Sequence, residues 1–157
     1  MRVGLIGLGA MGAPMARHLH ERGLLIAVGN RTQAKADVLA AELKVRAARS
    51  ADNFADCEVV VLCVSLDIDV IENVNALANV LKAGSSVVDH STVSVQTARR
   101  AAATLAEHGI GFVDAPVSGG VEGARTGRLS VMAGASHVVE LTSHWIPAHA
   151  GTQAQES

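Results

Sequence analysis

Three glycines near the N-terminus, at positions 7, 9 and 12, constrain the fold of this chain more than any other feature. They form the pattern G-x-G-x-x-G between the apolar run "RVGLI" and a stretch with helical period. In such a strand–turn–helix unit, the glycines permit a tight turn, let a pyrophosphate reach the backbone and let the helix pack closely. Free N–H groups at the helix start then attract phosphate. We therefore expect a dinucleotide-binding turn, with a ligand-free glycine turn as the alternative. The expected turn consists of Gly7, Leu8, Gly9, Ala10, Met11 and Gly12.

The remainder of the chain alternates apolar runs of strand length with Ala-rich runs of helical period. Strands are predicted at residues 2–7, 24–30, 58–64, 85–92, 110–116 and 129–134. Helices are predicted at residues 10–23, 32–44, 67–84 and 94–109, with Thr32 and Ser50 as N-caps of the second helix and of residues 51–57. This order predicts an α/β fold, a doubly wound Rossmann domain whose mainly parallel sheet carries helices on both faces.

The composition of the chain limits which partners it is expected to bind and in which cellular compartment it is expected to work. Aromatic residues make up only 2% of the chain and hydrophobic residues 49%, so Val, Leu, Ile and Ala must form the core. Thirteen basic and fifteen acidic residues give no reason to expect binding to nucleic acid or to an anionic membrane. The cysteines, Cys57 and Cys63, flank one apolar run and are expected to be reduced thiols of a cytoplasmic protein without a signal peptide. No cluster of His, Cys and Asp has the spacing of a metal site.

The end of the second predicted strand bears on the choice of cofactor. Domains that prefer NAD usually carry Asp or Glu there, about 20 residues past the glycines, to bind the ribose hydroxyls. This chain instead has Asn30, Arg31 and Thr32, followed by Lys35. Asn30 can bond the ribose, Arg31 can pair with a 2′-phosphate, and Thr32 can add a hydroxyl and a helix-start N–H. NADP is therefore expected rather than NAD, and an ordinary helix cap beside a solvated arginine is the alternative.

Four segments, in order, resemble the 3-hydroxyisobutyrate dehydrogenase family, which belongs with the 6-phosphogluconate dehydrogenase-like (β-hydroxyacid dehydrogenase) enzymes. They are "GLIGLGAMGAPMARHL" at residues 4–19, "NRT" at 30–32, "DHST" at 89–92 and "FVDAPVSGGVEGARTGRLSVMAG" at 112–134. The likeness extends over about residues 2–140. It implies hydride transfer between NADP and a small 3-hydroxy acid or its semialdehyde. Relatives that act as 6-phosphogluconate dehydrogenases or imine reductases share the fold, but "DAPVSGG" favours the 3-hydroxy-acid branch.

The resemblance also assigns residues to the two ligands. It implies that Ser118, Gly119 and Gly120 bind the carboxylate of the substrate. It places Thr92 near the nicotinamide ribose, and the backbone of Val64 and Ser65 against the cofactor. Family members often have proline where Ser65 stands, so this contact departs from the family pattern. His90, inside "DHST", is not expected to act in catalysis.

The catalytic lysine of the family lies downstream of the Ser-Gly-Gly segment. The lysines of this chain are Lys35, Lys44 and Lys82, so no catalytic residue is assigned. Residues 1–140 are expected to form the NADP-binding domain. Residues 141–157 read as an atypical tail in place of the family's all-helical domain.

The chain is therefore expected to be a truncated dehydrogenase, inactive alone. A non-catalytic nucleotide-binding module and a decayed gene product are the alternatives. A surface bared by the missing domain would favour a homodimer.

Overall fold

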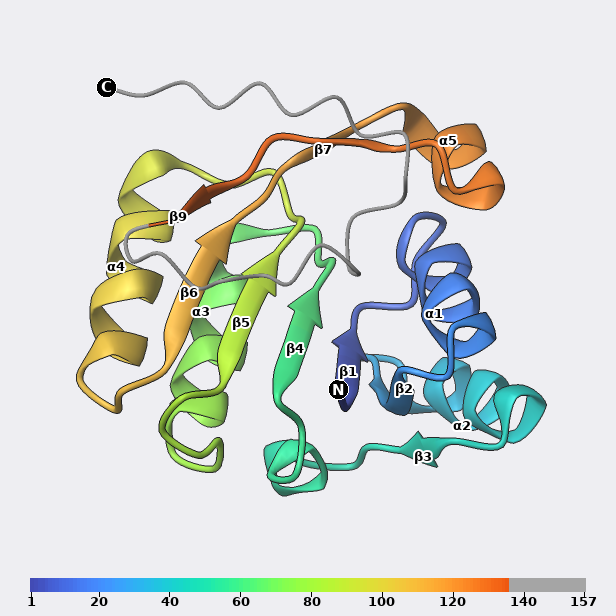
Figure 1. The fold of residues 1–157 in the computed structure, drawn as a ribbon, viewed down its shortest axis with the longest axis horizontal. Coiled ribbons are helices and arrows are strands. Elements are labelled where there is room, and N and C mark those ends of the chain that lie inside the picture. The colour runs from blue at the N-terminus through green and yellow to red at the C-terminus, as the bar shows by residue number, and fades with distance from the viewer. Residues whose placement is uncertain (136–157) are drawn as a thin grey trace.

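A seven-stranded sheet forms the centre of the computed structural model, which describes residues 1–135 (Figure 1). The strand order is β3-β2-β1-β4-β5-β6-β9, parallel throughout except for β9, which is antiparallel to β6. The strands are β1 (Val3–Ile6), β2 (Leu25–Gly29), β3 (Arg46–Ala47), β4 (Val59–Leu62), β5 (Ser86–Asp89), β6 (Gly111–Asp114) and β9 (Gly134–Ala135). A separate two-stranded sheet pairs β7 (Val117–Ser118) with β8 (Ser130–Val131).

Helices cover both faces of the sheet (Figure 1). They are α1 (Gly12–Glu21), α2 (Gln33–Leu43), α3 (Asp67–Ala78), α4 (Val95–Ala106) and the short α5 (Gly120–Thr126), with one 3-10 turn, η1 (Ala51–Phe54). The strand order reverses between β1 and β4, so right-handed crossovers place α1 and α2 on one face and α3 and α4 on the other. The expected doubly wound Rossmann fold is confirmed.

Alternation along the strands divides the core into two layers. In β4, Val59 and Val61 pack with the α1–α2 layer, whereas Val60 and Leu62 pack with the α3–α4 layer. All four residues are buried, as expected for strands covered on both faces. Aliphatic side chains therefore fill both layers, and Phe54 and Phe112 are the aromatic residues of the core among residues 1–135.

The third helix ends earlier than the sequence predicts. Helix α3 stops at Ala78 rather than continuing to Gly84. The N–H groups of Val80 and Leu81 both donate to the Leu77 carbonyl, which closes the helix in a tight turn. Leu81 is buried in the core, and Gly84, at φ 89°, takes part in the turn into β5. The turn into β5 therefore begins earlier than the helical period of the sequence indicates.

The predicted strand at residues 129–134 is in fact two short strands, β8 and β9, which belong to different sheets. Both are antiparallel to the preceding β6–β7 segment, and the pairing is interrupted at Pro116. Proline has no N–H to donate to a ladder, although the Pro116 carbonyl accepts from Met132 N at 3.0 Å.

Helix α5, which has glycine at its first and fourth positions, was not predicted. Residues 136–140 of the expected domain and the expected tail lie outside the described residues.

None of the helices within residues 1–135 combines the length and apolar character needed to cross a membrane.

Candidate nucleotide-binding site

The glycine turn joins the carboxyl end of β1 to the start of α1. Gly7 has φ 101°, and a Cβ atom there would overlap the backbone carbonyl of Cys63 after β4. A Cβ atom at Gly12 would overlap the carbonyl of Gly7. The tight turn and the close packing of the helix thus require these two glycines, as the sequence predicts.

Gly9 differs from its two neighbours in the motif. Gly9 is exposed, and a Cβ atom at this position would meet no other atom within 4 Å. The protein itself therefore does not require glycine at this position. A ligand that lies against the backbone would require it, which is the fit expected of a pyrophosphate beside the positive end of α1.

Asn30 fastens the glycine turn to the end of β2. Its side-chain oxygen accepts a hydrogen bond from Leu8 N at 2.8 Å, and its amide donates to the Thr32 carbonyl at 3.1 Å. The sequence did not indicate this bracing role. The expected contact of Asn30 with the ribose stays a prediction. Thr32 is the N-cap residue of α2, as predicted, but its side chain makes no capping hydrogen bond.

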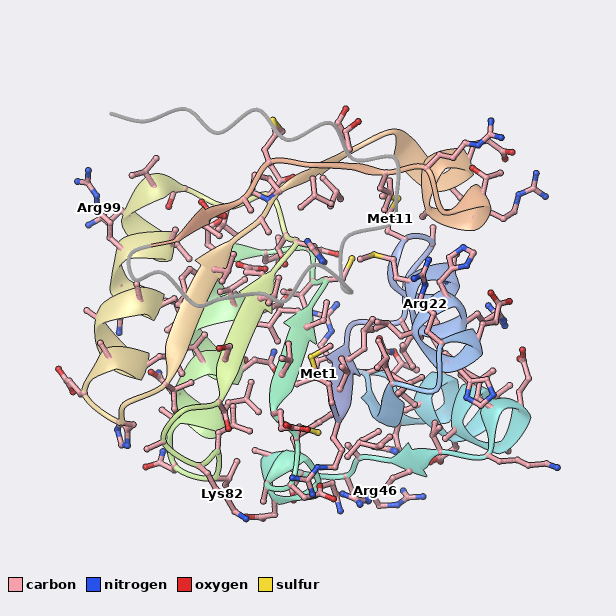
Figure 2. The ribbon with its side chains drawn as sticks, viewed as in Figure 1. Met1, Met11, Arg22, Arg46, Lys82 and Arg99 are labelled. Carbon is pink, nitrogen blue, oxygen red and sulfur yellow. The ribbon has the colours of Figure 1, made fainter. Side chains whose placement is uncertain are left out.

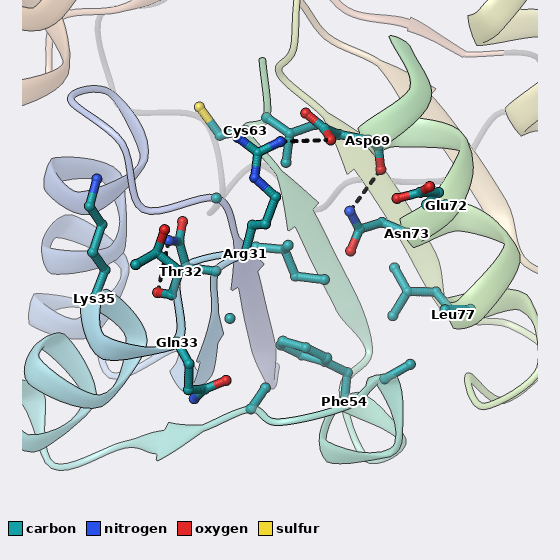
Figure 3. A pocket seen from close by; sticks show the side chains of 18 of the residues that line it. Arg31, Thr32, Gln33, Lys35, Phe54, Cys63, Asp69, Glu72, Asn73 and Leu77 are labelled. Carbon is teal, nitrogen blue, oxygen red and sulfur yellow. Dashed lines mark hydrogen bonds and ion pairs between the residues drawn. The ribbon is translucent and has the colours of Figure 1, made fainter. Parts of the chain in front are cut away.

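A pocket of ≈ 450 Å³ runs from the glycine turn across the ends of β1 and β2 to α3 (Figure 3). Many of the residues predicted to bind the cofactor line it, together with Lys35: Gly7, Gly9, Asn30, Arg31, Thr32, Val64 and Ser65. Leu8, Ala10, Met11 and Gly12 form the turn and the helix start beside it. Thr92 is exposed just beyond β5 and does not contribute to the wall of this pocket.

The opposite wall was missed at the sequence level. It is one face of α3, formed by Asp69, Glu72, Asn73, Ala76 and Leu77. These positions are spaced i, i+3, i+4, i+7 and i+8, so they share one face of the helix, but no motif in the sequence indicates that this face lines a pocket. Buried Phe54 lies at the floor, where a Cβ atom at Gly29 would come within 3.1 Å of its ring. Arg49 and Ser50, between β3 and η1, also line the pocket.

Opposite charges meet across the pocket. Arg31 Nη1 lies 3.5 Å from Asp69 Oδ1, and the Arg31 side chain is 83% exposed (Figure 3). Arg49 also lines the pocket, and its Nη2 donates to Asp37 Oδ1 at 3.1 Å. Lys35 stands on the far side of Thr32 from Asp69. The wall from β2 and α2 is thus cationic, whereas Asp69 and Glu72 make the α3 wall anionic.

A buried polar network lies behind the pocket, at the carboxyl ends of β4 and β5. Val64 N donates to Ser91 Oγ at 3.0 Å, and Ser91 N donates to Asp89 Oδ1 at 2.9 Å. The other carboxyl oxygen of Asp89 is buried and has no hydrogen-bond partner within the described part of the chain. Burial raises the pKa of Asp89 to about 6, although the bonds from Ser91 oppose the rise. This network positions the Val64 backbone at the pocket.

The residues predicted to bind substrate lie apart from the pocket. Ser118, Gly119 and Gly120 are exposed where β7 passes into α5, and the two glycines have φ 126° and 61°. His18 of α1 anchors α5: its Nε2 lies 3.0 Å from the Ala124 and Arg125 carbonyls at the end of that helix. A smaller cavity of ≈ 190 Å³ adjoins this contact, with Met15, His90 and Leu129 among its walls.

His90 is buried, and its Nδ1 lies 2.6 Å from the Ala115 carbonyl. Burial lowers the pKa of its imidazole, despite that hydrogen bond. Among residues 1–135, no group of three His, Cys, Asp or Glu side chains could hold a metal ion. The chemistry that this part of the chain supports is the binding of a phosphorylated, extended ligand.

A Rossmann sheet with a glycine turn at its first crossover and a long pocket beside it defines a dinucleotide-binding domain. Residues 2–146 match the family model of the NAD binding domain of 6-phosphogluconate dehydrogenase. The chain belongs to this family, and the resemblance to β-hydroxyacid dehydrogenases is confirmed.

Named relatives agree with this placement. 2-(Hydroxymethyl)glutarate dehydrogenase of Eubacterium barkeri is 36% identical over 143 residues, which cover 88% of this chain and 47% of that protein. Mycobacterium tuberculosis 3-hydroxyisobutyrate dehydrogenase, solved with L-serine, has a TM-score of 0.80 at 32% identity, covering 85% of this chain and 47% of that one. Psf3, solved with NADP+ and 2-OPP, has a TM-score of 0.77 at 33% identity, covering 85% and 48%. The chain thus spans about half the length of the curated relatives that it matches.

Proposed function

We propose that this chain is the NADP-binding half of a dehydrogenase that interconverts a small 3-hydroxy acid and its semialdehyde. The observation that carries the cofactor assignment is the cationic wall of the pocket. Arg31 lines the pocket two residues after β2, in a strand end, Asn30-Arg31-Thr32, that lacks the carboxylate usual in NAD-preferring domains. The family supplies the reaction class, because its members are oxidoreductases.

Different residues of the chain are proposed to bind different parts of the cofactor. Gly9 and the start of α1 would hold the pyrophosphate, since the backbone there is open to a ligand. The Arg31 guanidinium would pair with the 2′-phosphate, as a planar fork matches phosphate oxygens. Val64, fixed by Ser91, and Thr92 would flank the nicotinamide end. When bound, the nicotinamide supplies the acceptor or donor of hydride.

The Ser118–Gly119–Gly120 segment is proposed to bind the substrate carboxylate. The Ser118 residue is exposed, and the two glycines beside it leave their backbone N–H groups uncovered by side chains, so that the segment can present several donors to an anion. The relative solved with L-serine carries a small hydroxylated carboxylate, which fits this substrate class.

Oxidation of an alcohol also requires a group that takes its proton. Lys35 lines the nucleotide pocket, Lys44 ends α2, and Lys82 lies before β5, at the opposite end of the view from α5 (Figure 2). None of these lysines is placed to serve the Ser118 segment. We infer that the proton acceptor belongs to the half of the relatives that this chain does not cover, and that the chain alone does not turn over.

The test of the cofactor assignment is calorimetric titration of the chain and its Arg31→Ala variant with NADPH and NADH. We expect the variant to bind NADPH at least about tenfold more weakly, a loss of about 1.4 kcal/mol, and NADH almost unchanged. Arg49→Ala is the matched control, because it removes the same charge from the same pocket. An unchanged ratio of NADPH to NADH affinity in Arg31→Ala would contradict the 2′-phosphate assignment.

A further inference from the structure

We propose that Asp69 sets how strongly this domain prefers NADPH, because its carboxylate competes with the 2′-phosphate for Arg31. The inference rests on the proposed function, since it assumes that Arg31 binds that phosphate. Asp69 lies at the third position of α3, on the wall of the pocket that faces Arg31 (Figure 3).

The competition follows from the geometry of the ion pair. Arg31 Nη1 is 3.5 Å from Asp69 Oδ1, and this pair bridges the pocket between the loop after β2 and α3. A phosphate that accepts two hydrogen bonds from the Arg31 guanidinium must displace the Asp69 carboxylate or share the guanidinium with it. The Asp69 charge therefore acts more strongly against the ligand with the extra phosphate than against NADH.

The two ends of the pair differ in freedom. The Arg31 side chain is 83% exposed, whereas that of Asp69 is 16% exposed. The second oxygen of Asp69 accepts from Leu66 N at 3.2 Å, and its backbone carbonyl accepts from Asn73 Nδ2 at 2.7 Å. Asp69 is thus held in place on α3, and Arg31 is the partner that moves when a phosphate arrives.

The size of the effect is modest, because the guanidinium is largely in water. An exposed ion pair of this kind is worth about 1 kcal/mol or less, which corresponds to an affinity change of up to about fivefold. Asp69 therefore reduces the preference for NADPH over NADH, and Arg31 is the residue that creates this preference.

Asp69→Asn tests the proposal, because asparagine can still accept from Leu66 N while it loses the charge. We expect NADPH to bind about threefold to fivefold more tightly and NADH to change by less than about twofold in calorimetric titrations. Glu72→Gln is the matched control. It removes a charge from the same face of α3, one turn further along, and its effect on NADPH should be smaller.

A double-variant cycle separates this inference from the proposed function. In the Arg31→Ala background, Asp69→Asn should no longer raise NADPH affinity beyond the change seen with Glu72→Gln. If Arg31→Ala abolishes the preference but Asp69→Asn leaves NADPH affinity unchanged, the competition is refuted and the proposed function stands. If Asp69→Asn weakens NADH binding, Asp69 binds the cofactor directly and the competition is also refuted. If Arg31→Ala leaves the preference unchanged, the proposed cofactor assignment itself fails.

Discussion

The nucleotide pocket and the Ser118 segment are built from different amounts of this chain. Residues from β1, β2, α2, η1 and α3 line the pocket, and the glycine turn at one end of it is fixed by backbone packing and by Asn30. Ser118, Gly119 and Gly120 instead lie exposed on a two-residue strand and the start of a seven-residue helix. On the proposed function, the described residues enclose the cofactor pocket on several sides but offer the substrate only one exposed segment.

The largest expected effect is on the free energy of unfolding, and it should differ between two glycines of the same turn. Gly12→Ala should destabilise the chain by about 3 kcal/mol or more, because its Cβ overlaps a backbone carbonyl that cannot move without opening the turn. Gly9→Ala should change the free energy of unfolding by less than about 0.5 kcal/mol, because its Cβ enters open space. Urea unfolding measures both.

The Gly9→Ala variant also tests whether the glycine turn binds the cofactor phosphates. Gly9→Ala should lose at least about tenfold in NADPH affinity, because the methyl group would stand where the pyrophosphate meets the backbone. A Gly9→Ala variant that folds and binds NADPH like the parent chain would show that the phosphates do not lie against this turn. Gly9 would then no longer differ from Gly12 as the glycine that is required by the ligand rather than by the fold.

A second effect concerns Asp89, which lies behind the pocket. Its pKa of about 6 in the folded chain exceeds the ordinary value of the unfolded chain, so the folded state binds more protons between about pH 4 and pH 6. Its contribution to stability is therefore greatest below pH 4 and is lost as the pH rises through 6. The pKa difference corresponds to as much as about 3 kcal/mol.

Asp89→Asn should remove this dependence, so that urea unfolding at pH 5 and pH 8 differs less in the variant than in the parent chain. Glu107→Gln, at an exposed position after α4, is the control for a general change of charge. Equal pH dependence in the Asp89→Asn variant and the parent would show that the buried carboxyl does not titrate in this range.

The smallest effect tests whether the two regions are independent. His18→Ala removes the contacts with the Ala124 and Arg125 carbonyls, so α5 should open about fivefold more often, as expected from a loss of about 1 kcal/mol. Amide hydrogen exchange at Gly123 and Arg128 reports this opening. NADPH affinity should change by less than about twofold, and His20→Ala is the matched control on the same helix. An equal loss of NADPH affinity would show that the two regions are coupled.

The sequence predicted those parts of the molecule that depend on local pattern. The glycine turn, the alternation of strands and helices, and Arg31 at the end of β2 all follow from spacing and residue type. Asp69 and Phe54 reach the pocket only because the crossovers bring α3 and η1 beside β2, so no neighbouring motif marks them. The early end of α3 and the interruption at Pro116 escaped prediction for a related reason. Each depends on what the adjoining backbone must bond or bury.

The bracing role of Asn30 bears on how such domains diverge. Its side chain is engaged with Leu8 N and with the Thr32 carbonyl, so it maintains the turn that is proposed to face the phosphates. The proposed selector, Arg31, is the adjacent residue but contributes nothing to that turn. On the proposed function, a substitution at position 31 would therefore change the choice of cofactor while the turn that Asn30 braces stays intact.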